Sequence, residues 1–313
     1  MTDTASGLSI VAENLRRTYG DVIAVDNISL AVRRGSVLGL LGVNGAGKTT
    51  MVRMLATVLK PDSGRATVHG FDVITQAQDV RRSIGLAGQN AAVDENLTGR
   101  ENLELVGRLS HLGRAHSSER AGQLLDQFGL TDAGNRPVRT YSGGMRRRLD
   151  LGAALVANPP VLFLDEPTTG LDPASRLDLW GVIESLVSDG TTVLLTTQYL
   201  EEADRLADNI VVIDKGLIAA EGTAKQLKDR LGDTVIEFEF SDAARAKSAG
   251  ATLDSTVSAG TIVRLVMTDG PATLRDAMNK LSAANNAPSH VALREPTLDD
   301  VFLTLTGGGV TND

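Results

Sequence analysis

The segment at residues 42–50, GVNGAGKTT, constrains the fold and chemistry of this chain more than any other feature. An apolar run at residues 37–41 precedes it and is typical of a buried strand, and the pattern at residues 51–59 predicts a helix that stops near Pro61. A strand, a glycine-rich loop and a helix in this order are the setting in which the spacing G-x-x-x-x-G-K-[ST] binds phosphates. A chance match in a glycine-rich turn is the alternative, and both flanking elements count against it.

The residue types of this loop explain its chemistry. Glycines let the backbone turn so that its N–H groups converge on an anion, and the N-terminus of the following helix adds a favourable dipole. Lys48 can reach the β- and γ-phosphates, and the Thr49 hydroxyl can ligate Mg²⁺. We therefore expect the chain to bind a nucleoside triphosphate. The loop residues assigned to the nucleotide are Gly42, Asn44, Gly45, Gly47, Lys48, Thr49 and Thr50.

Composition excludes several other classes of function. The 313 residues leave room for about two domains. The formal net charge of −8 argues against a general polyanion-binding surface. Since there is no cysteine, disulfides, thiolate nucleophiles and Cys-based metal sites are excluded. No apolar run approaches the ~18 residues that span a bilayer, and no secretory signal is expected, so another chain must supply any path across a membrane.

The pattern along the chain predicts two domains. Residues 1–228 alternate strands and helices, which indicates an α/β domain with a mainly parallel sheet, and a helical insert is expected at about residues 90–150. Residues 234–313 are expected to form a smaller α+β domain. Strands are predicted as short segments within residues 8–32, near 66–69, and at 161–164, 193–196, 210–213, 235–240 and 261–267, with late helices at 274–281 and 298–305.

Two carboxylates follow the apolar run at residues 161–164. In P-loop enzymes an acid at the end of such a strand holds Mg²⁺, commonly through water, and Asp165 is placed for this. Glu166 comes one residue later, where its carboxylate can polarise a water for in-line attack on the γ-phosphate. The alternative is that both acids merely end a strand, and the P-loop favours the functional interpretation.

The segment that begins at Ser142 is a second candidate for contact with phosphate. This residue is a good N-cap for the helix that follows, while Gly143 and Gly144 leave the N-terminal amides of that helix bare. An ordinary capped helix would look the same. Three arginines follow Met145, at residues 146–148: Arg146, Arg147 and Arg148. They suggest either nucleic-acid binding or a solvated helix face paired with acids, and the acidic composition favours the solvated face.

At this point a family resemblance becomes specific. The segment YSGGMRRRL, residues 141–149, resembles the signature motif of ATP-binding cassette (ABC) proteins. Tyr19 matches the aromatic residue that stacks on adenine, Gln89 matches the glutamine that contacts Mg²⁺ and water, and residues 170–172 match the D-loop. Over almost the whole chain, segments such as LTGRENLELVGRLSHLG, DEPTTGLDPASR and REPTLDDVFLTLTG resemble the ATP-binding subunit of daunorubicin/doxorubicin-resistance exporters.

The resemblance implies a P-loop ABC nucleotide-binding domain, with a mixed-sheet core and a helical subdomain, and a small C-terminal domain. It implies an ATPase that powers efflux of an anthracycline-like drug or a lipid, and so confers antibiotic resistance. Two copies would dimerise head to tail, so that Ser142, Gly143 and Gly144 of one copy complete the site of the other. The partner would be a separate integral membrane permease, in two copies, with the chain bound peripherally at the cytoplasmic face of the membrane.

Two further segments take a role only from this resemblance. The insert around residues 91–112 would form a groove for a cytoplasmic helix of the permease. The C-terminal domain would contact its twin or regulate dimer opening, and the resemblance points to the last helix, residues 295–305, for such contacts. No nucleic-acid partner is expected.

One residue departs from the family pattern. The usual switch histidine is replaced by Gln198, which can donate a hydrogen bond to the γ-phosphate but cannot carry a positive charge. We expect Gln198 to sense the γ-phosphate, with slow turnover. Two alternatives stay open: a soluble ABC ATPase acting on ribosomes or DNA, and a nucleotide-gated regulator with negligible hydrolysis. Relatives of the first kind usually carry two fused cassettes or a long coiled-coil insert, neither of which occurs here, and an intact Glu166 argues against the second.

Overall fold

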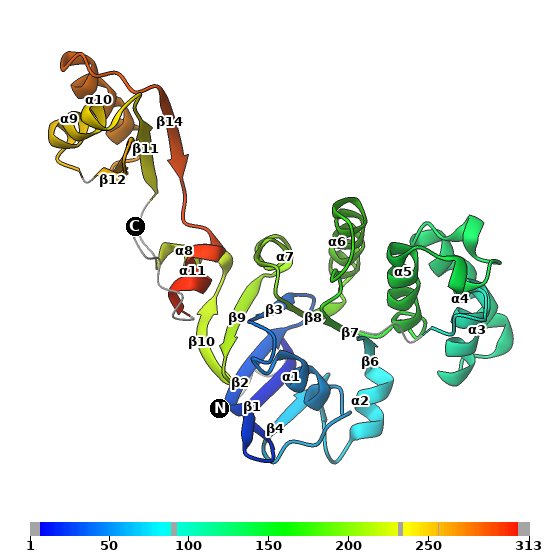
Figure 1. The fold of residues 1–313 in the computed structure, drawn as a ribbon. Coiled ribbons are helices and arrows are strands. Elements are labelled where there is room, and N and C mark those ends of the chain that lie inside the picture. The colour runs from blue at the N-terminus through cyan, green and yellow to red at the C-terminus, as the bar shows by residue number, and fades with distance from the viewer. Residues whose placement is uncertain (1–6, 89–92, 231–233, 256, 306–313) are drawn as a thin grey trace. The chain divides into compact units, whose positions relative to one another are not determined.

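The computed structural model describes residues 7–88, 93–230, 234–255 and 257–305. The chain divides into two compact units, residues 1–224 and 225–313 (Figure 1). Two hydrophobic clusters form the core of the first unit, and a separate cluster forms the core of the second. The predicted fold class, an α/β domain with a helical part followed by a small α+β domain, is confirmed.

A six-stranded sheet in the first unit carries the candidate site. All its neighbouring strands are parallel except β10, which is antiparallel to β9. Every residue of β3, β7 and β8 is buried, which is why the sequences of β3 and β7 are almost entirely apolar. Their carboxyl ends meet at one edge of the sheet. In sheet order the strands are β10 (Leu217–Gly222), β9 (Asn209–Asp214), β3 (Val37–Leu41), β8 (Thr192–Thr197), β7 (Val161–Asp165) and β6 (Ile84–Ala87).

A second sheet of the same unit is antiparallel, in the order β2-β1-β4-β5. Strands β1 (Leu8–Tyr19) and β2 (Val22–Arg33) form a hairpin, and each has 12 residues, longer than the short strands predicted. The two strands stay paired along their length through several register shifts, and each shift breaks the apolar alternation that would mark one long strand. The other two strands are β4 (Ser63–Val68) and β5 (Phe71–Asp72).

Helix α1 (Lys48–Leu55) follows the glycine-rich loop and packs into one core with both sheets (Figure 1). Its buried residues Met51 and Leu55 share that core with Ile10 of β1 and Leu40 of β3. The helix ends at Leu55 rather than near residue 59, because Thr57 adopts a left-handed φ of 61°. The predicted helix is therefore confirmed with an earlier end.

The helical part of the first unit contains α3 (Gly99–Leu109), α4 (Arg114–Gln127) and α5 (Gly143–Ala154). Helix α3 begins with a capping box, in which the side chains of Thr98 and Glu101 each accept a hydrogen bond from the other's backbone amide. These helices pack around one core, so the helical insert predicted from the apolar spacing is confirmed. The other helices are α2 (Ala77–Ser83), α6 (Pro173–Ser188), α7 (Leu200–Leu206) and α8 (Ala224–Asp229), with 3₁₀ turns η2 (Thr131–Ala133) and η3 (Val138–Thr140).

The second unit contains an antiparallel four-stranded sheet of order β12-β13-β11-β14. Helices α9 and α10 each connect two of its strands, which gives a split β-α-β arrangement. Helices α9 and α10 share a core with β11 and β13, built around Phe238 and Val263. Sequence patterns predicted β11, β13, α10 and α11 but missed α9, β12 and β14. The elements are β11 (Val235–Glu239), α9 (Ala243–Leu253), β12 (Val257–Ala259), β13 (Ile262–Val266), α10 (Pro271–Ala283), β14 (His290–Arg294) and α11 (Leu298–Leu305).

Among the residues that the structure describes, none of the helices has the length and apolarity needed to span a bilayer.

Candidate nucleotide-binding site

A pocket of about 540 Å³ lies in the first unit at the carboxyl edge of the six-stranded sheet. It brings together residues from the glycine-rich loop, from the end of β7 and from the loop after β8. Eight of the residues assigned from the sequence line it. The lining residues are Ala24, Asn44, Gly45, Gly47, Lys48, Thr49, Thr50, Arg147, Glu166, Thr169 and Gln198.

The glycine-rich loop owes its shape to two positions where no side chain fits. A Cβ at Gly42 would lie 2.4 Å from the Ile213 carbonyl oxygen, and one at Gly47 would lie 2.3 Å from the Ala24 carbonyl oxygen. Gly47 also has a φ of 114°, which only glycine adopts without strain. It is the N-cap of α1, and no side chain caps that helix. The first amides of α1 are therefore free of side-chain caps at an anion-favouring helix end.

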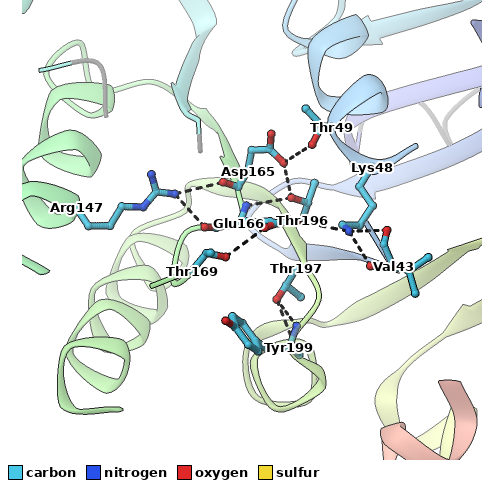
Figure 2. A network of polar contacts seen from close by, with 11 residues as sticks. Val43, Lys48, Thr49, Arg147, Asp165, Glu166, Thr169, Thr196, Thr197 and Tyr199 are labelled. Atoms are coloured by element: carbon cyan, nitrogen blue, oxygen red, sulfur yellow. Dashed lines mark hydrogen bonds and ion pairs between the residues drawn. The ribbon is translucent and has the colours of Figure 1, made fainter. Parts of the chain in front are cut away.

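Lys48 is a buried cation at the floor of the pocket, with only 4% of its surface exposed. Its Nζ donates hydrogen bonds to the carbonyl oxygens of Gly42 at 2.7 Å and Val43 at 3.2 Å. The same Nζ lies 3.7 Å from Oε1 of Glu166 (Figure 2). Burial lowers the pKa of Lys48, and the charges of Glu166 and Asp165 oppose that shift. The ammonium is thus held by two loop carbonyls and a carboxylate, whose places a phosphate can take.

One carboxylate oxygen of Asp165 joins the two nucleotide motifs. Oδ1 accepts hydrogen bonds from Oγ1 of Thr49 at 3.1 Å and from Oγ1 of Thr196 at 2.6 Å (Figure 2). Hydroxyl and carboxylate oxygens are the ligands that Mg²⁺ prefers, and Mg²⁺ usually keeps several waters. No cluster of three His, Cys, Asp or Glu side chains within the described ranges is suited to hold a metal by itself. The donor set therefore fits an ion that is shared with a phosphate and water.

Glu166 has an uncommon backbone conformation that directs its carboxylate into the pocket. Its φ is 51°, a left-handed value that costs a non-glycine residue about 1–3 kcal/mol and persists only where the surroundings enforce it. The amide of Glu166 donates to both the carbonyl oxygen and Oγ1 of Thr196, each at 3.1 Å. On the other side, Oγ1 of Thr169 donates to Oε2 of Glu166 at 3.2 Å. The side chain is therefore fixed close to Lys48.

Gln198 lines the pocket from the loop between β8 and α7. The loop is anchored by its neighbours, because Oγ1 of Thr197 accepts a hydrogen bond from the Tyr199 amide at 2.9 Å. The guanidinium of Arg176 stacks over the Tyr199 ring at 4.6 Å. Gln198 thus lines the same pocket as Glu166 and Lys48.

Other assigned residues do not line this pocket. Tyr19 is 45% exposed, and the Arg17 guanidinium lies 5.3 Å from the centre of its ring. Gly42 lies beneath Lys48 and contributes its carbonyl oxygen. Ser142 is the predicted N-cap of α5, and its side chain accepts a hydrogen bond from the Met145 amide at 3.2 Å. Gln89 lies outside the described residues. Gly143 and Gly144 begin α5 and are likewise absent from the pocket lining.

The arginine run on α5 requires a correction. Arg146 lies in an exposed ion pair with Glu95 at 2.7 Å, as a solvated face would have it. Arg147 does not, because its side chain is 10% exposed and its donors go mainly to main-chain carbonyls. Arg148 also donates to a carbonyl, that of Phe128, at 3.3 Å. The interpretation of the run as a solvated face was therefore wrong for Arg147 and Arg148.

Sequence reasoning also missed Thr169, Thr196 and Arg147 as parts of the site. The two threonines carried no signal, since hydroxyls at strand ends are common. Arg147 carried one, because it falls at helical spacing between Gly144 and Leu151, both of which are buried. That spacing places it on the inward face of α5.

Comparison with known proteins gives consistent matches along the chain. The family model described as ABC transporter matches residues 25–169. A daunorubicin resistance ATP-binding protein of Streptomyces coeruleorubidus is 53% identical over 311 residues, covering 98% of this chain and 97% of that protein. A doxorubicin resistance ATP-binding protein of Mycobacterium tuberculosis is 46% identical over 310 residues, covering 96% and 94%.

Solved structures resemble the first part of the chain. An ATP-binding subunit of an ABC transporter superposes with a TM-score of 0.65 at 26% identity, covering 71% of this chain and 92% of that one. A dimeric ATP-binding cassette, in a post-hydrolysis state with ADP and phosphate bound, superposes with a TM-score of 0.63 at 25% identity, covering 68% and 98%.

Thr196→Val tests the hydroxyl that joins Asp165 to Glu166. The substitution keeps the shape of the side chain but removes a donor to Asp165 and an acceptor for the Glu166 amide. We expect the free energy of unfolding in urea to fall by about 1–3 kcal/mol, since buried polar groups lose a partner. Thr67→Val, at a half-buried position on β4, is the matched control and should change it by less than about 0.5 kcal/mol. Equal losses in the two variants would contradict this account.

Proposed function

This chain belongs to the ABC transporter family and is one of its ATP-hydrolysing subunits, and we propose that it powers export of a hydrophobic drug or lipid through a separate membrane permease. The observation that carries the proposal is that Lys48, Glu166 and Gln198 line one pocket, with Asp165 bonded to Thr49 of the same lining. The drug-resistance role of relatives that match almost the whole chain supports an anthracycline-like cargo.

In the proposed reaction the chain's own residues bind and orient ATP. The loop amides around Asn44, Gly45 and Thr50 and the ammonium of Lys48 hold the phosphates, and Tyr19 stacks on adenine. Thr49 and Asp165 would hold Mg²⁺ together with Gln89, and a bound Mg²⁺ neutralises charge that develops on the phosphate oxygens. The hydrogen bond between Thr49 and Asp165 supports this assignment, because it already brings both oxygens to one place.

Glu166 is the proposed general base. Its carboxylate reaches the pocket between Lys48 and Thr169, where it can take a proton from a water that attacks the γ-phosphate. Gln198 lines the same pocket, and its side-chain amide would donate a hydrogen bond to the γ-phosphate. A neutral amide stabilises the developing charge less than an imidazolium, so turnover is expected to be slow.

We further propose that two copies of the chain close over two ATP molecules. Ser142 and Gly143 are exposed at the N-terminus of α5 and do not line the pocket of their own chain. Their amides, with that of Gly144, would complete the phosphate cradle of the second copy. The similarity to a cassette that is dimeric with ADP and phosphate bound supports this arrangement. ATP then favours the closed dimer, because it binds that state better than the open one.

A groove in the first unit suits the permease. It has a volume of about 650 Å³ and lies among α2, β6, the end of α3 and α5. Leu109 and Leu86 on its wall are 70% and 39% exposed, and Arg81 and Arg82 lie at the same groove. Exposed apolar side chains rimmed by charge are typical of a protein interface. We propose that a cytoplasmic permease helix with apolar and acidic side chains occupies it, which would keep the chain at the cytoplasmic face of the membrane.

Substitutions at the pocket test the ATPase mechanism. Glu166→Gln should lower the rate of phosphate release by about 10²- to 10⁴-fold while ATP still binds, and should trap an ATP-bound dimer on size exclusion. Lys48→Ala, the control, should lose ATP binding itself. Undiminished hydrolysis in Glu166→Gln would exclude Glu166 as the base, and negligible hydrolysis in the unaltered chain would favour a nucleotide-gated regulator.

Gln198→Ala should slow phosphate release below the rate of the unaltered chain. An unchanged rate would refute the contact of Gln198 with the γ-phosphate.

Affinity purification of the tagged chain from detergent-solubilised membranes of its native host tests the partner. We expect a membrane protein with several spans in stoichiometric amount, and a large loss of it with Leu109→Asp, because a charge would be buried in the groove. Leu217→Asp is the matched control, since Leu217 is 53% exposed on β10 and does not line the groove. Recovery of ribosomes or nucleic acid without a membrane protein would instead support a soluble ABC ATPase.

The C-terminal domain, residues 234–313, is proposed to regulate dimer opening through α11. Its separate core around Phe238 supports a domain that can be removed without disturbing the pocket. A chain cut after Lys228 should bind ATP with unchanged affinity but form a weaker dimer or a less stable complex with the permease. Calorimetry and light scattering measure the two effects. Dimerisation and permease recovery equal to those of the full chain would disprove this role.

A further inference from the structure

Arg147 is a buried cation that the proposed reaction does not use. It lies on the inward face of α5 and lines the nucleotide pocket. An arginine side chain has five N–H donors, and the structure gives this one five acceptors. Nε donates to the carbonyl oxygen of Pro167 at 2.7 Å. Nη1 donates to the carbonyl oxygen of Gly88 and, at 3.3 Å, to Oδ2 of Asp150. Nη2 donates to the carbonyl oxygens of Asp165 and Glu166, at 3.3 Å each.

The number and kind of acceptors separate Arg147 from Lys48. Lys48 is held by two loop carbonyls and a carboxylate that lies 3.7 Å away, so a phosphate can replace them. Arg147 would have to break a bond to the main chain before it could donate to a phosphate. Its position at the pocket therefore indicates an action on the pocket wall and not on the nucleotide.

Three of the acceptors are the consecutive carbonyls of Asp165, Glu166 and Pro167. Figure 2 shows the bonds to the first two. The guanidinium is planar and rigid, so it fixes these carbonyls relative to one another and to α5. This restraint acts on a strained residue. Glu166 has a left-handed φ of 51°, which persists only where the surrounding structure enforces it. The Gly88 carbonyl ties the end of β6 to the same side chain.

We propose that Arg147 is a positioning residue for ATP hydrolysis, which holds residues 165–167 against α5 so that the Glu166 carboxylate faces the pocket. This inference rests on the proposed function, because it takes Glu166 as the base. Lysine cannot replace arginine here, since one ammonium carries three donors at a single point and cannot span acceptors on both Gly88 and residues 165–167.

Arg147→Lys, measured beside Arg148→Lys, tests the proposal by steady-state kinetics of phosphate release. The matched control Arg148 is the next residue of α5 and donates to the Phe128 carbonyl, away from Glu166. We expect Arg147→Lys to lower kcat about tenfold to a hundredfold with KM for ATP within about threefold, because the base is misplaced and not the nucleotide. Arg148→Lys should change kcat by less than about twofold.

Hydrogen exchange supplies a readout that does not depend on hydrolysis. The Glu166 amide is bonded to Thr196, and its exchange should be at least about tenfold faster in Arg147→Lys than in Arg148→Lys if Arg147 restrains this loop. Faster exchange with unchanged kcat would overturn the proposal, and so would a raised KM at constant kcat, which would make Arg147 a phosphate ligand. An unchanged exchange rate together with an unchanged kcat would also overturn the proposal.

Two further outcomes separate this inference from the proposed function. Undiminished hydrolysis in Glu166→Gln removes the base from the mechanism whatever Arg147 does, so the failure would belong to the proposed function. Arg147→Gln is the second variant if Arg147→Lys does not fold, with the same expected fall in kcat. If neither variant folds or binds ATP, Arg147 is a residue of the core and the proposal is wrong.

Discussion

A single carboxylate oxygen holds the candidate site together. Oδ1 of Asp165, at the end of β7, accepts hydrogen bonds from Thr49 at the start of α1 and from Thr196 on β8. These bonds join the ends of neighbouring parallel strands to the helix that follows the glycine-rich loop. Thr196 extends the link to the Glu166 amide, so the backbone that aims the proposed base depends on the same strand. The geometry of the whole pocket is therefore set by a few buried bonds at the edge of one sheet.

Two buried cations face this edge, and their surroundings give them different tasks. Lys48 makes two hydrogen bonds to carbonyls of the glycine-rich loop and a longer contact to Glu166, all of which a phosphate can replace. Arg147 has every donor engaged, four of them on main-chain carbonyls. A cation held as Lys48 is can bind a ligand at little cost, whereas a cation held as Arg147 is keeps the pocket wall rigid. The two cations of the pocket thus differ in the number and kind of acceptors that hold them, which is the basis of the different roles proposed for them.

The parts of the site that could be predicted from the sequence are those whose geometry is local. The order of strand, loop and helix places Lys48 and Thr49, and an apolar run ending in two acids places Asp165 and Glu166. Arg147 could not be located in this way, because its acceptors lie up to 59 residues away along the chain and a run of arginines in an acidic protein indicates solvent. In the second unit α9 was missed because its sequence, AARAKSAGATL, buries alanine and glycine where larger apolar residues would reveal the period.

Gln198 brings these features together. A histidine at this place would add a group that titrates near neutral pH beside Lys48, whose pKa is already lowered by burial. An amide adds a donor without a charge, so the charged side chains that line the pocket are Lys48, Arg147 and Glu166. Because the donors of Arg147 are engaged, stabilisation of a γ-phosphate falls mainly to Lys48 and to the loop amides. If Glu166 is the base, as proposed, its position is the feature of the site that the surrounding protein controls most directly.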